Sequence, residues 1–310
     1  MRRLWDISIS QSLRVSVFKG GIPVKLTYLG TSASEGWPAF FCDCAICREA
    51  LRRGGKDLRF RSCAVIDDDI ILDLSPDLYA ARRQFNVSLS EVKHIVFTHW
   101  HADHCDAPSL HWYAPNFVRE ADGQRQKLKI YASPVVCNIL RNMDDLWGRP
   151  SIGGWVDFVE TELFTAKMID KNTRITAFTA YHGSRAGANV YKIERGGKTM
   201  LYLHDTGRLD EDTIAFLSGN PVDLVTMDAT SGPSAAQPNS GHMGFANNIV
   251  LRDRLKQAGI IDEHTKLICN HICIHACHTS DGLMYFHDDL EKMMHAEGFT
   301  VAYDGLTLEI

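Results

Sequence analysis

The sequence has no apolar run near the ~20 residues that a membrane-spanning helix needs. It also lacks internal repeats, low-complexity segments and any linker rich in proline, serine or charge. The start, Met-Arg-Arg, is not followed by the apolar segment of a signal peptide. We therefore expect a cytoplasmic protein with no membrane contact, built as one domain over residues 24–310 behind an N-terminal extension over residues 1–23.

Positive charge is not in excess, since 33 Lys and Arg stand against 38 Asp and Glu in 310 residues. The net charge of −5 gives no general attraction for polyanions. A nucleic-acid substrate stays open only through a local basic patch, such as Arg52 and Arg53 with Arg59 and Arg61.

The nine cysteines are an odd number, in a sequence without an export signal. Clustered thiols in that context are more typical of metal ligands or free thiols than of disulfides. Cys63, Cys105 and Cys137 are isolated and fit as small apolar side chains. Two clusters stand apart from them: Cys42, Cys44 and Cys47, and then Cys269, Cys273 and Cys277.

Alternating and short apolar runs predict strands, and helical patterns lie between and after them. Strands followed by helices in both halves predict an α/β protein with sheets covered by helices. At the C-terminus, residues 299–303 and 305–309 are typical of a hairpin. The strands are expected at 24–29, 63–66, 70–74, 94–97, 128–131, 174–180, 189–193, 199–203 and 266–269, and the helices at 77–85, 210–217, 245–258 and 288–296.

The most informative motif is His99-Trp-His101-Ala-Asp103-His104, directly after the apolar run 94–97. Four residues of ligand type in six positions are rarely produced by strand capping or surface location alone. Neutral imidazoles with a carboxylate suit zinc, manganese or iron at a hydrolytic site.

Three later residues stand singly at the ends of predicted strands. His182 follows the strand 174–180, Asp205 follows 199–203, and His271 follows 266–269. A single His or Asp at such a position is common in loops and does not by itself indicate a functional site. Together they add two histidines and one carboxylate able to bridge two metals.

This order of motifs resembles the metallo-β-lactamase superfamily, from about Val24 to the C-terminus. The resemblance implies an αββα sandwich, two β-sheets packed face to face with helices outside. It also implies two divalent ions, zinc or manganese, with one set of ligands each. His99, His101 and His182 would hold the first ion; Asp103, His104 and His271 would hold the second, and Asp205 would bridge them.

Further motifs are similar to one branch of that family, the phosphoribosyl cyclic phosphodiesterase of the carbon–phosphorus lyase pathway, and also to tRNA 3′-processing endonucleases. They are Gly30-Thr31, Pro38, the Cys42 cluster, His204 to Gly207, Met227-Asp228 and Tyr303 to Gly305. The branch implies a structural zinc on Cys42, Cys44, Cys47 and a late histidine. The family's position for that histidine is Ile274 here, so we expect His275, with His278, Cys273 and Cys277 as the alternatives.

His242, in Ser240-Gly241-His242-Met243, lies where related phosphodiesterases place a histidine that donates a proton to the leaving group. The alternative is an ordinary helix-start residue. The resemblance implies a phosphodiesterase with His242 and Asp103 as catalytic residues, a hydroxide shared by the two metals as nucleophile, and a small-molecule phosphodiester as substrate. Asp73 and Asp228 are candidates for orienting a histidine.

Three alternatives to this function stay open. The same fold could cleave a lactone or a thioester, could act on RNA 3′ ends, or could bind metal without catalysis. The oligomeric state usual in the family, together with the additional N-terminal segment Met1 to Gly21, leads us to expect a homodimer.

Overall fold

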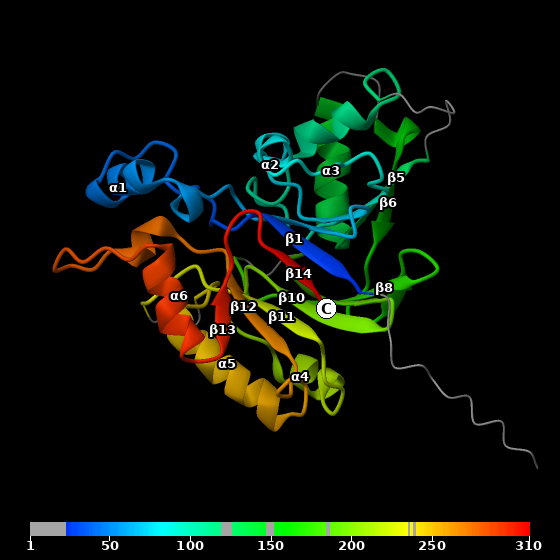
Figure 1. Cartoon of the computed structure of the whole chain (residues 1–310). Helices are drawn as coiled ribbons and strands as arrows, with labels where there is room; N and C mark the ends of the chain where they lie inside the picture. Colours follow the sequence, from blue (N-terminus) through cyan, green and yellow to red (C-terminus); the bar gives the residue numbers. More distant parts are fainter. Residues whose placement is uncertain (1–22, 119–125, 147–151, 184–186, 235, 238–239) are drawn as a thin grey trace, which may run out of the picture.

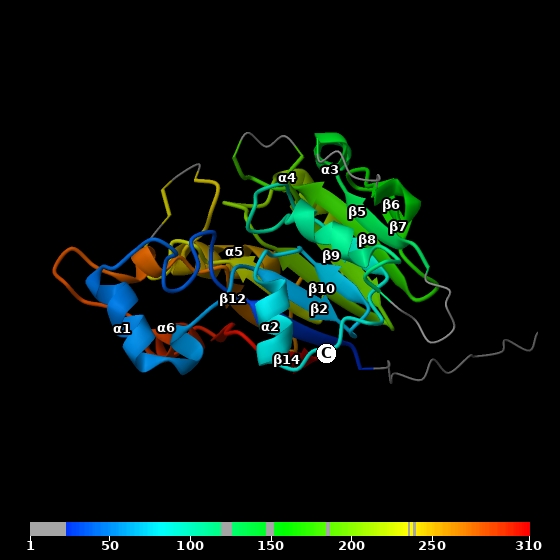
Figure 2. The same cartoon turned by 90° about the horizontal axis from the view of Figure 1, so that it is seen from above.

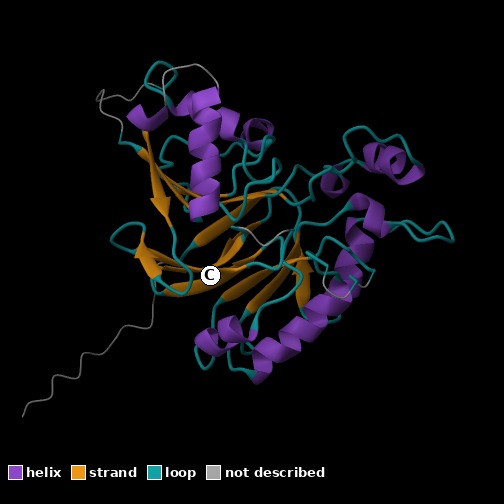
Figure 3. Ribbon diagram, turned by 180° about the vertical axis from the view of Figure 1, so that it is seen from behind, coloured by secondary structure: helices purple, strands orange, loops and turns teal. Residues whose placement is uncertain are grey.

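The computed structural model describes residues 23–118, 126–146, 152–183, 187–234, 236–237 and 240–310. Two seven-stranded sheets form its centre, in the orders β14-β1-β2-β3-β4-β5-β6 and β13-β12-β11-β10-β9-β8-β7. Helices lie on the outer side of both sheets (Figures 1 and 3). This is the αββα sandwich that the sequence predicted.

The first sheet and its helices come mainly from the first half of the chain. Its elements are β1 (Lys25–Gly30), β2 (Cys63–Ile66), β3 (Ile70–Leu72), α2 (Leu78–Gln84), β4 (His94–Val96), β5 (Leu128–Ala132), α3 (Pro134–Leu146), β6 (Val156–Glu160) and, from the C-terminus, β14 (Thr307–Glu309).

The second sheet and its helices come from the second half. Its elements are β7 (Ala166–Met168), β8 (Thr173–Thr179), β9 (Asn189–Arg195), β10 (Lys198–Leu203), α4 (Glu211–Leu217), β11 (Leu224–Asp228), α5 (Phe245–Gln257), β12 (Lys266–Asn270), α6 (His287–His295) and β13 (Phe299–Val301). Helix α1 (Ala45–Arg53) and the 3-10 helix η4 (Ile274–Cys277) extend from one end of the sandwich. Figure 2 shows α1 projecting beyond the sheets near α6.

The central strands of the first sheet, β2, β3 and β4, are buried on both faces. In β3, Ile70 and Leu72 pack between the two sheets, and Ile71 packs toward the helices on the other face. Successive strand residues point to opposite faces. A strand covered on both sides therefore has a continuous apolar sequence, which is why Ile70-Ile71-Leu72 does not alternate with polar residues.

The predicted C-terminal hairpin is wrong. β13 pairs with β12 in the second sheet, and β14 pairs with β1 in the first. Residues 302–306 cross between the sheets, and Asp304 accepts hydrogen bonds there from Thr31 Oγ1 at 2.7 Å and from the Phe60 amide at 2.5 Å. Two apolar segments joined by a short loop resemble a hairpin, but their strand partners lie far away in sequence.

Five helices and strands were not predicted from the sequence, namely α1, α3, β6, β7 and β11. Residues 1–22, nearly all of the expected N-terminal extension, lie outside the described residues. No helix among the described residues is long and apolar enough to cross a membrane.

Candidate metal centre

The predicted ligands lie where strands of both sheets end at one edge of the sandwich. β10, β11 and β12 run parallel to one another, and β8 runs in the same direction because β9 is antiparallel to both β8 and β10. The loops after these strands therefore meet at one edge. His182, Asp205 and His271 come from them, while the motif from His99 to His104 follows β4 of the other sheet.

The first group contains His99, His101, His182 and Asp205, whose donor atoms all lie within 4.8 Å of one another. His182 Nε2 is 3.0 Å from His101 Nδ1, and His99 Nε2 is 3.4 Å from Asp205 Oδ2. The second group contains Asp103, His104, Asp205 and His271. Asp205 belongs to both groups, as a bridging carboxylate requires.

Within the second group, His104 Nε2 lies 3.1 Å from His271 Nε2. Asp205 Oδ1 is 3.0 Å from His271 Nε2, and Asp103 Oδ2 is 3.1 Å from His104 Nε2. The structure thus brings all seven predicted ligands together in two adjacent sets.

Four of the histidines are oriented by a partner on Nδ1, which leaves Nε2 directed at the centre. Such a partner fixes both the ring orientation and the tautomer. The pairs are His99 with Thr98 Oγ1 at 3.0 Å, His104 with Asp73 Oδ2 at 2.8 Å, His182 with the Gly241 carbonyl at 3.1 Å, and His271 with Thr230 Oγ1 at 2.8 Å.

Three residues of the centre have positive φ angles, namely Asp73 at 61°, Asp205 at 51° and His271 at 61°. Residues without glycine's freedom rarely occupy this region, and such backbone strain is often found at functional sites. Asp73 and His271 directly follow a strand, and Asp205 follows β10 after one residue, so the turn places each side chain within the centre instead of along the strand.

Burial and opposite charge shift the pKa values of these groups strongly. Burial alone would lower the pKa of His271, but Asp205 and Asp103 raise it to about 10. His99 behaves in the opposite way, since burial and the neighbouring histidine His104 hold its pKa well below the usual value. Burial would raise the pKa of Asp205, whereas the histidines around it lower it well below the usual range.

The arrangement of donor atoms fits divalent metal ions. His99 Nε2 and Asp205 Oδ1 are buried and make no hydrogen bond of good geometry among the described residues, although Asp205 Oδ1 lies 3.0 Å from His271 Nε2. Such buried polar atoms are rare in native proteins unless a water or ion satisfies them. Imidazole and carboxylate donors suit zinc or manganese, so His99, His101, His182 and Asp205 would hold one ion, and Asp103, His104, His271 and Asp205 a second.

His242 lies beside this centre but is held by a different set of partners. Its Nδ1 is 2.9 Å from Asp228 Oδ2 and 3.0 Å from Thr230 Oγ1, and its ring stands 4.7 Å from the His182 ring. Asp228 also accepts hydrogen bonds from the amides of Thr230 at 3.0 Å and Met243 at 2.8 Å. The donor atoms of Asp228 and His242 also lie within 4.8 Å of those of Asp205 and His271. Because both oxygens of Asp228 already accept hydrogen bonds, we assign it the role of orienting His242.

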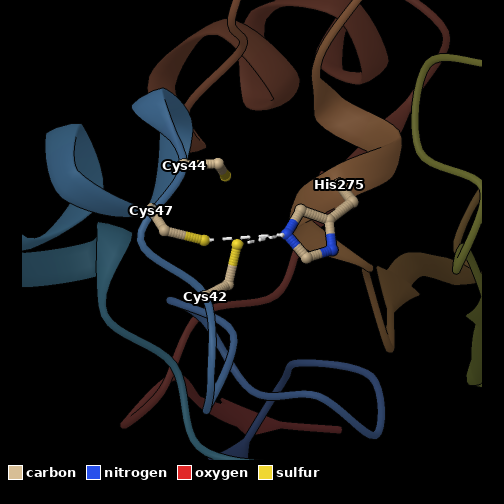
Figure 4. Close-up of side chains that lie close together, drawn as sticks. All are labelled: Cys42, Cys44, Cys47 and His275. Carbon is tan, nitrogen blue, oxygen red and sulfur yellow. Dashed lines mark hydrogen bonds between the residues drawn. The ribbon is translucent and has the colours of Figure 1, made fainter.

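The thiolate cluster forms a separate site between the start of α1 and η4. The donor atoms of Cys42, Cys44, Cys47 and His275 lie within 4.8 Å of one another. His275 Nε2 is 3.3 Å from Cys42 Sγ and 3.7 Å from Cys47 Sγ. Figure 4 shows the imidazole directed at these two sulfurs. Burial would raise the pKa of the Cys44 thiol, but hydrogen bonds from the Cys47 amide, Cys42, Cys47 and His275 lower it to about 6.

Of the alternatives for the fourth position, His275 is the residue that the structure places against the three thiols. Ile274 is buried, and Cys277 donates to the Cys273 carbonyl at 3.5 Å. His278 lines a cavity of about 310 Å³ together with Cys42, Cys44 and His275, but it does not belong to the group of four donors. The donor set of three sulfurs and one imidazole fits a structural zinc.

Two orienting residues at the centre were missed in the sequence. Thr98 bonds both Asp73 and His99, and Thr230 bonds both His242 and His271. Thr98 precedes the first motif histidine directly, and Thr230 lies two residues after Asp228, at the end of β11. Their positions after strands were the available signal, but hydroxyl side chains are common in such loops.

A family model described as the beta-lactamase superfamily domain matches residues 69–264. The chain belongs to this metallo-β-lactamase superfamily, whose members are mostly metal-dependent hydrolases that bind divalent ions. The match includes His99 to His104, His182, Asp205 and His242, while His271 and the thiolate cluster lie outside it. A comparison with curated protein sequences finds no match.

Solved structures with the same fold cover nearly the whole chain. A crystal structure of a new diphosphatase from the PhnP family is 20% identical, with a TM-score of 0.69 over 93% of this chain and 98% of that one. Zn²⁺-bound PqqB from Methylobacterium extorquens is 19% identical, with a TM-score of 0.64 over 92% and 100%. The short form of human tRNase Z is 14% identical, with a TM-score of 0.57 over 92% and 98%. At these identities the similarity shows the fold.

Proposed function

We propose that this chain is a metal-dependent phosphodiesterase that acts on a small-molecule phosphodiester. The observation that carries the proposal is the pair formed by His242 and Asp228, 2.9 Å apart, whose donor atoms lie within 4.8 Å of those of the ligands Asp205 and His271. A hydrolase of this fold needs the metal ligands for any ester. A phosphodiester with a poor alkoxide leaving group also needs a proton donor, and a positioned cationic histidine can supply that proton.

The surroundings keep His242 suited to donate a proton. Burial would lower its pKa, but Asp228 and, more weakly, Asp205 raise the pKa above the usual value for histidine. Its side chain is 28% exposed, whereas Asp228 is completely buried. His242 is therefore accessible to a substrate, while the buried Asp228 carboxylate fixes the orientation of its ring.

The reaction that follows is hydrolysis of one P–O bond. Divalent ions held by the two ligand sets would supply positive charge to a water and to the phosphoryl oxygens. The water oxygen bonds to phosphorus, the bond from phosphorus to the leaving oxygen breaks, and His242 gives its proton to that oxygen. Asp228 stabilises the imidazolium before transfer. The proton released from water restores His242 for the next cycle.

The test compares leaving groups in a His242→Ala variant. General acids contribute roughly 10²–10⁴-fold, so we expect kcat on an alkyl phosphodiester to fall by about 10²-fold or more. Bis-p-nitrophenyl phosphate expels a stable phenolate and should lose far less. Metal content, measured by elemental analysis, should not change.

His264→Ala is the matched control, because the His264 side chain is 85% exposed and pairs only weakly with Glu263. Equal losses on both phosphodiesters, with metal retained, would contradict the role as proton donor. A lactone and a thioester complete the substrate panel. If the metal-loaded wild type cleaves one of these and neither phosphodiester, the proposed function is wrong.

A further inference from the structure

We propose that Arg208, supported by the ring of Tyr181, binds a second anionic group of the substrate. The preferred substrates would then be diphosphate esters, with a second phosphoryl group beside the one that is cleaved. This inference rests on the proposed phosphodiesterase function and narrows its substrate class.

The position of Arg208 follows from the two loops that carry His182 and Asp205. The Tyr181 amide donates to Thr206 Oγ1 at 2.8 Å, and the Gly207 amide donates to the Tyr181 carbonyl at 3.0 Å. Thr206 Oγ1 in turn donates to the Arg208 carbonyl at 2.7 Å. These hydrogen bonds hold Tyr181 and Arg208 together. Tyr181 directly precedes the ligand His182, and Arg208 lies three residues after the ligand Asp205.

A third loop, which carries His242, packs against these two. A Cβ atom at Gly207 would lie 1.8 Å from the Ser240 carbonyl oxygen, so the two backbones approach too closely for any side chain. A Cβ atom at Gly241 would lie 3.1 Å from His182 Nδ1. The loop that ends in Arg208 is thus in contact with the loop that presents the proposed proton donor.

The guanidinium of Arg208 is anchored without losing its charge. Its Cζ lies 3.7 Å from the centre of the Tyr181 ring, and Nη2 donates a hydrogen bond to the Tyr181 hydroxyl. Stacking on an aromatic ring restricts an arginine side chain and leaves donors at its edge available. The residue is exposed at the surface.

Other arginines in the second half of the chain are paired with carboxylates, for example Arg174 with Glu194 and Arg254 with Glu211. For Arg208, no carboxylate within 4.0 Å is found among the described residues. An oriented, uncompensated guanidinium is suited to phosphoryl oxygens, which it can bind through two parallel hydrogen bonds.

The charge of the substrate decides between a simple phosphodiester and a diphosphate ester. A simple phosphodiester has one negative charge, which His242 and the divalent ions that the two ligand sets would hold can already neutralise. A diphosphate diester has a second charge on the adjacent phosphoryl group. Arg208 supplies a fixed cation for that charge on the neighbouring loop.

The experiment uses the full chain loaded with metal and compares ADP-ribose, a diphosphate diester, with bis-p-nitrophenyl phosphate. For Arg208→Gln we expect KM for ADP-ribose to rise about 10-fold or more, as for loss of a charge-assisted hydrogen bond. KM for bis-p-nitrophenyl phosphate should change much less, and Arg208→Lys should give an intermediate result. Arg82→Gln, an exposed position on α2, removes the same charge elsewhere and should alter neither KM.

A binding measurement keeps the test independent of turnover. The α,β-methylene analogue of ADP-ribose, titrated by calorimetry into metal-loaded protein, should bind at least 5-fold more weakly to Arg208→Gln than to the wild type. An unchanged Kd and KM, or equal losses on both esters, would overturn the inference while leaving the phosphodiesterase intact. If the wild type hydrolyses neither ester, the proposed function fails, and the difference in Kd still decides whether Arg208 binds the diphosphate.

Discussion

At the residue scale, the sequence predicted the ligands better than the residues that orient them. His99, His101, Asp103 and His104 lie within six positions directly after a strand, and this density of ligand-type side chains made their grouping predictable. His242 needs Asp228 and Thr230 from the end of another strand, and this relation depends on how the strands assemble. Only a three-dimensional arrangement shows which hydroxyl or carboxylate faces which imidazole.

Asp73 provides a test at this scale. Its Oδ2 receives the Nδ1–H of His104 at 2.8 Å, and its Oδ1 accepts from the Thr98 amide at 2.7 Å. In Asp73→Asn, the amide oxygen would keep the Thr98 contact, so the amide N–H₂ would face His104 Nδ1. His104 would then carry its proton on Nε2, where it could not bind a metal.

We expect Asp73→Asn to lower the affinity for one of the two ions by about 10–100-fold, the usual effect of losing an orienting partner. Competition with a chelator of known affinity measures this change. Asp69→Asn, at the other end of β3 and paired with Arg195, is the control and should leave the affinity unchanged. Equal affinity in Asp73→Asn and wild type would show that Asp73 does not orient His104.

At the element scale, the thiolate cluster joins two segments that are more than 220 residues apart in sequence. Cys42, Cys44 and Cys47 lie at the start of α1, and His275 lies in η4. The clustered cysteines indicated metal ligands or free thiols. The resemblance to the phosphodiesterase branch implied a structural zinc and left four residues open for the fourth position. The 3-10 geometry of η4 turns Ile274 into the core and His275 toward the sulfurs, which no spacing rule indicates.

Replacing Cys44 by Ser tests the role of this cluster. We expect one zinc fewer per chain and a Tm lower by about 5 °C or more, since 1 kcal/mol corresponds to about 2–4 °C in domains of 150–250 residues. Turnover per metal-loaded centre should change less than stability. Elemental analysis and calorimetric melting measure both effects.

Three further variants identify the fourth ligand. His275→Gln should lose zinc as Cys44→Ser does, whereas His278→Gln should keep it. Cys273→Ser should also keep it. Zinc retained in Cys44→Ser, with an unchanged Tm, would mean that the cluster is not a metal site.

At the scale of the whole molecule, local patterns in the sequence predicted sheets covered by helices, and the resemblance to the metallo-β-lactamase superfamily implied two sheets packed face to face. Neither predicted the assignment of strands to sheets. β13 and β14 are neighbours in sequence and belong to different sheets. Local patterns describe which residues form strands. Pairing between β14 and β1, which are about 280 residues apart, depends on the packing of the complete core.

A buried arginine links the two ends of the chain near that crossing. Arg59 is 4% exposed and donates to the Ala302 carbonyl at 3.0 Å, and its Nη2 is 3.2 Å from His287 Nδ1 at the start of α6. Because the arginine donates, His287 Nδ1 accepts and the ring is neutral. Burial, Arg59 and Lys56 lower the pKa of His287 to about 3.

This contact predicts a contribution to stability that depends on pH. In the unfolded chain the pKa of histidine is about 6.5, so below that pH the unfolded state binds a proton that folded His287 does not. The free energy of unfolding therefore falls as the pH drops from about 6.5 toward 3. At pH 5.0 the loss from this residue is about 2 kcal/mol, at 1.36 kcal/mol per pH unit.

In His287→Gln, the amide oxygen can accept from Arg59 and cannot titrate. Urea unfolding at pH 7.5 and 5.0 should then show a smaller loss of stability for the variant than for the wild type. Comparing the two proteins cancels the pH dependence of the metal ligands, which both share. Equal losses in both proteins would mean that His287 is already protonated in the folded chain, or that Arg59 is not held against it.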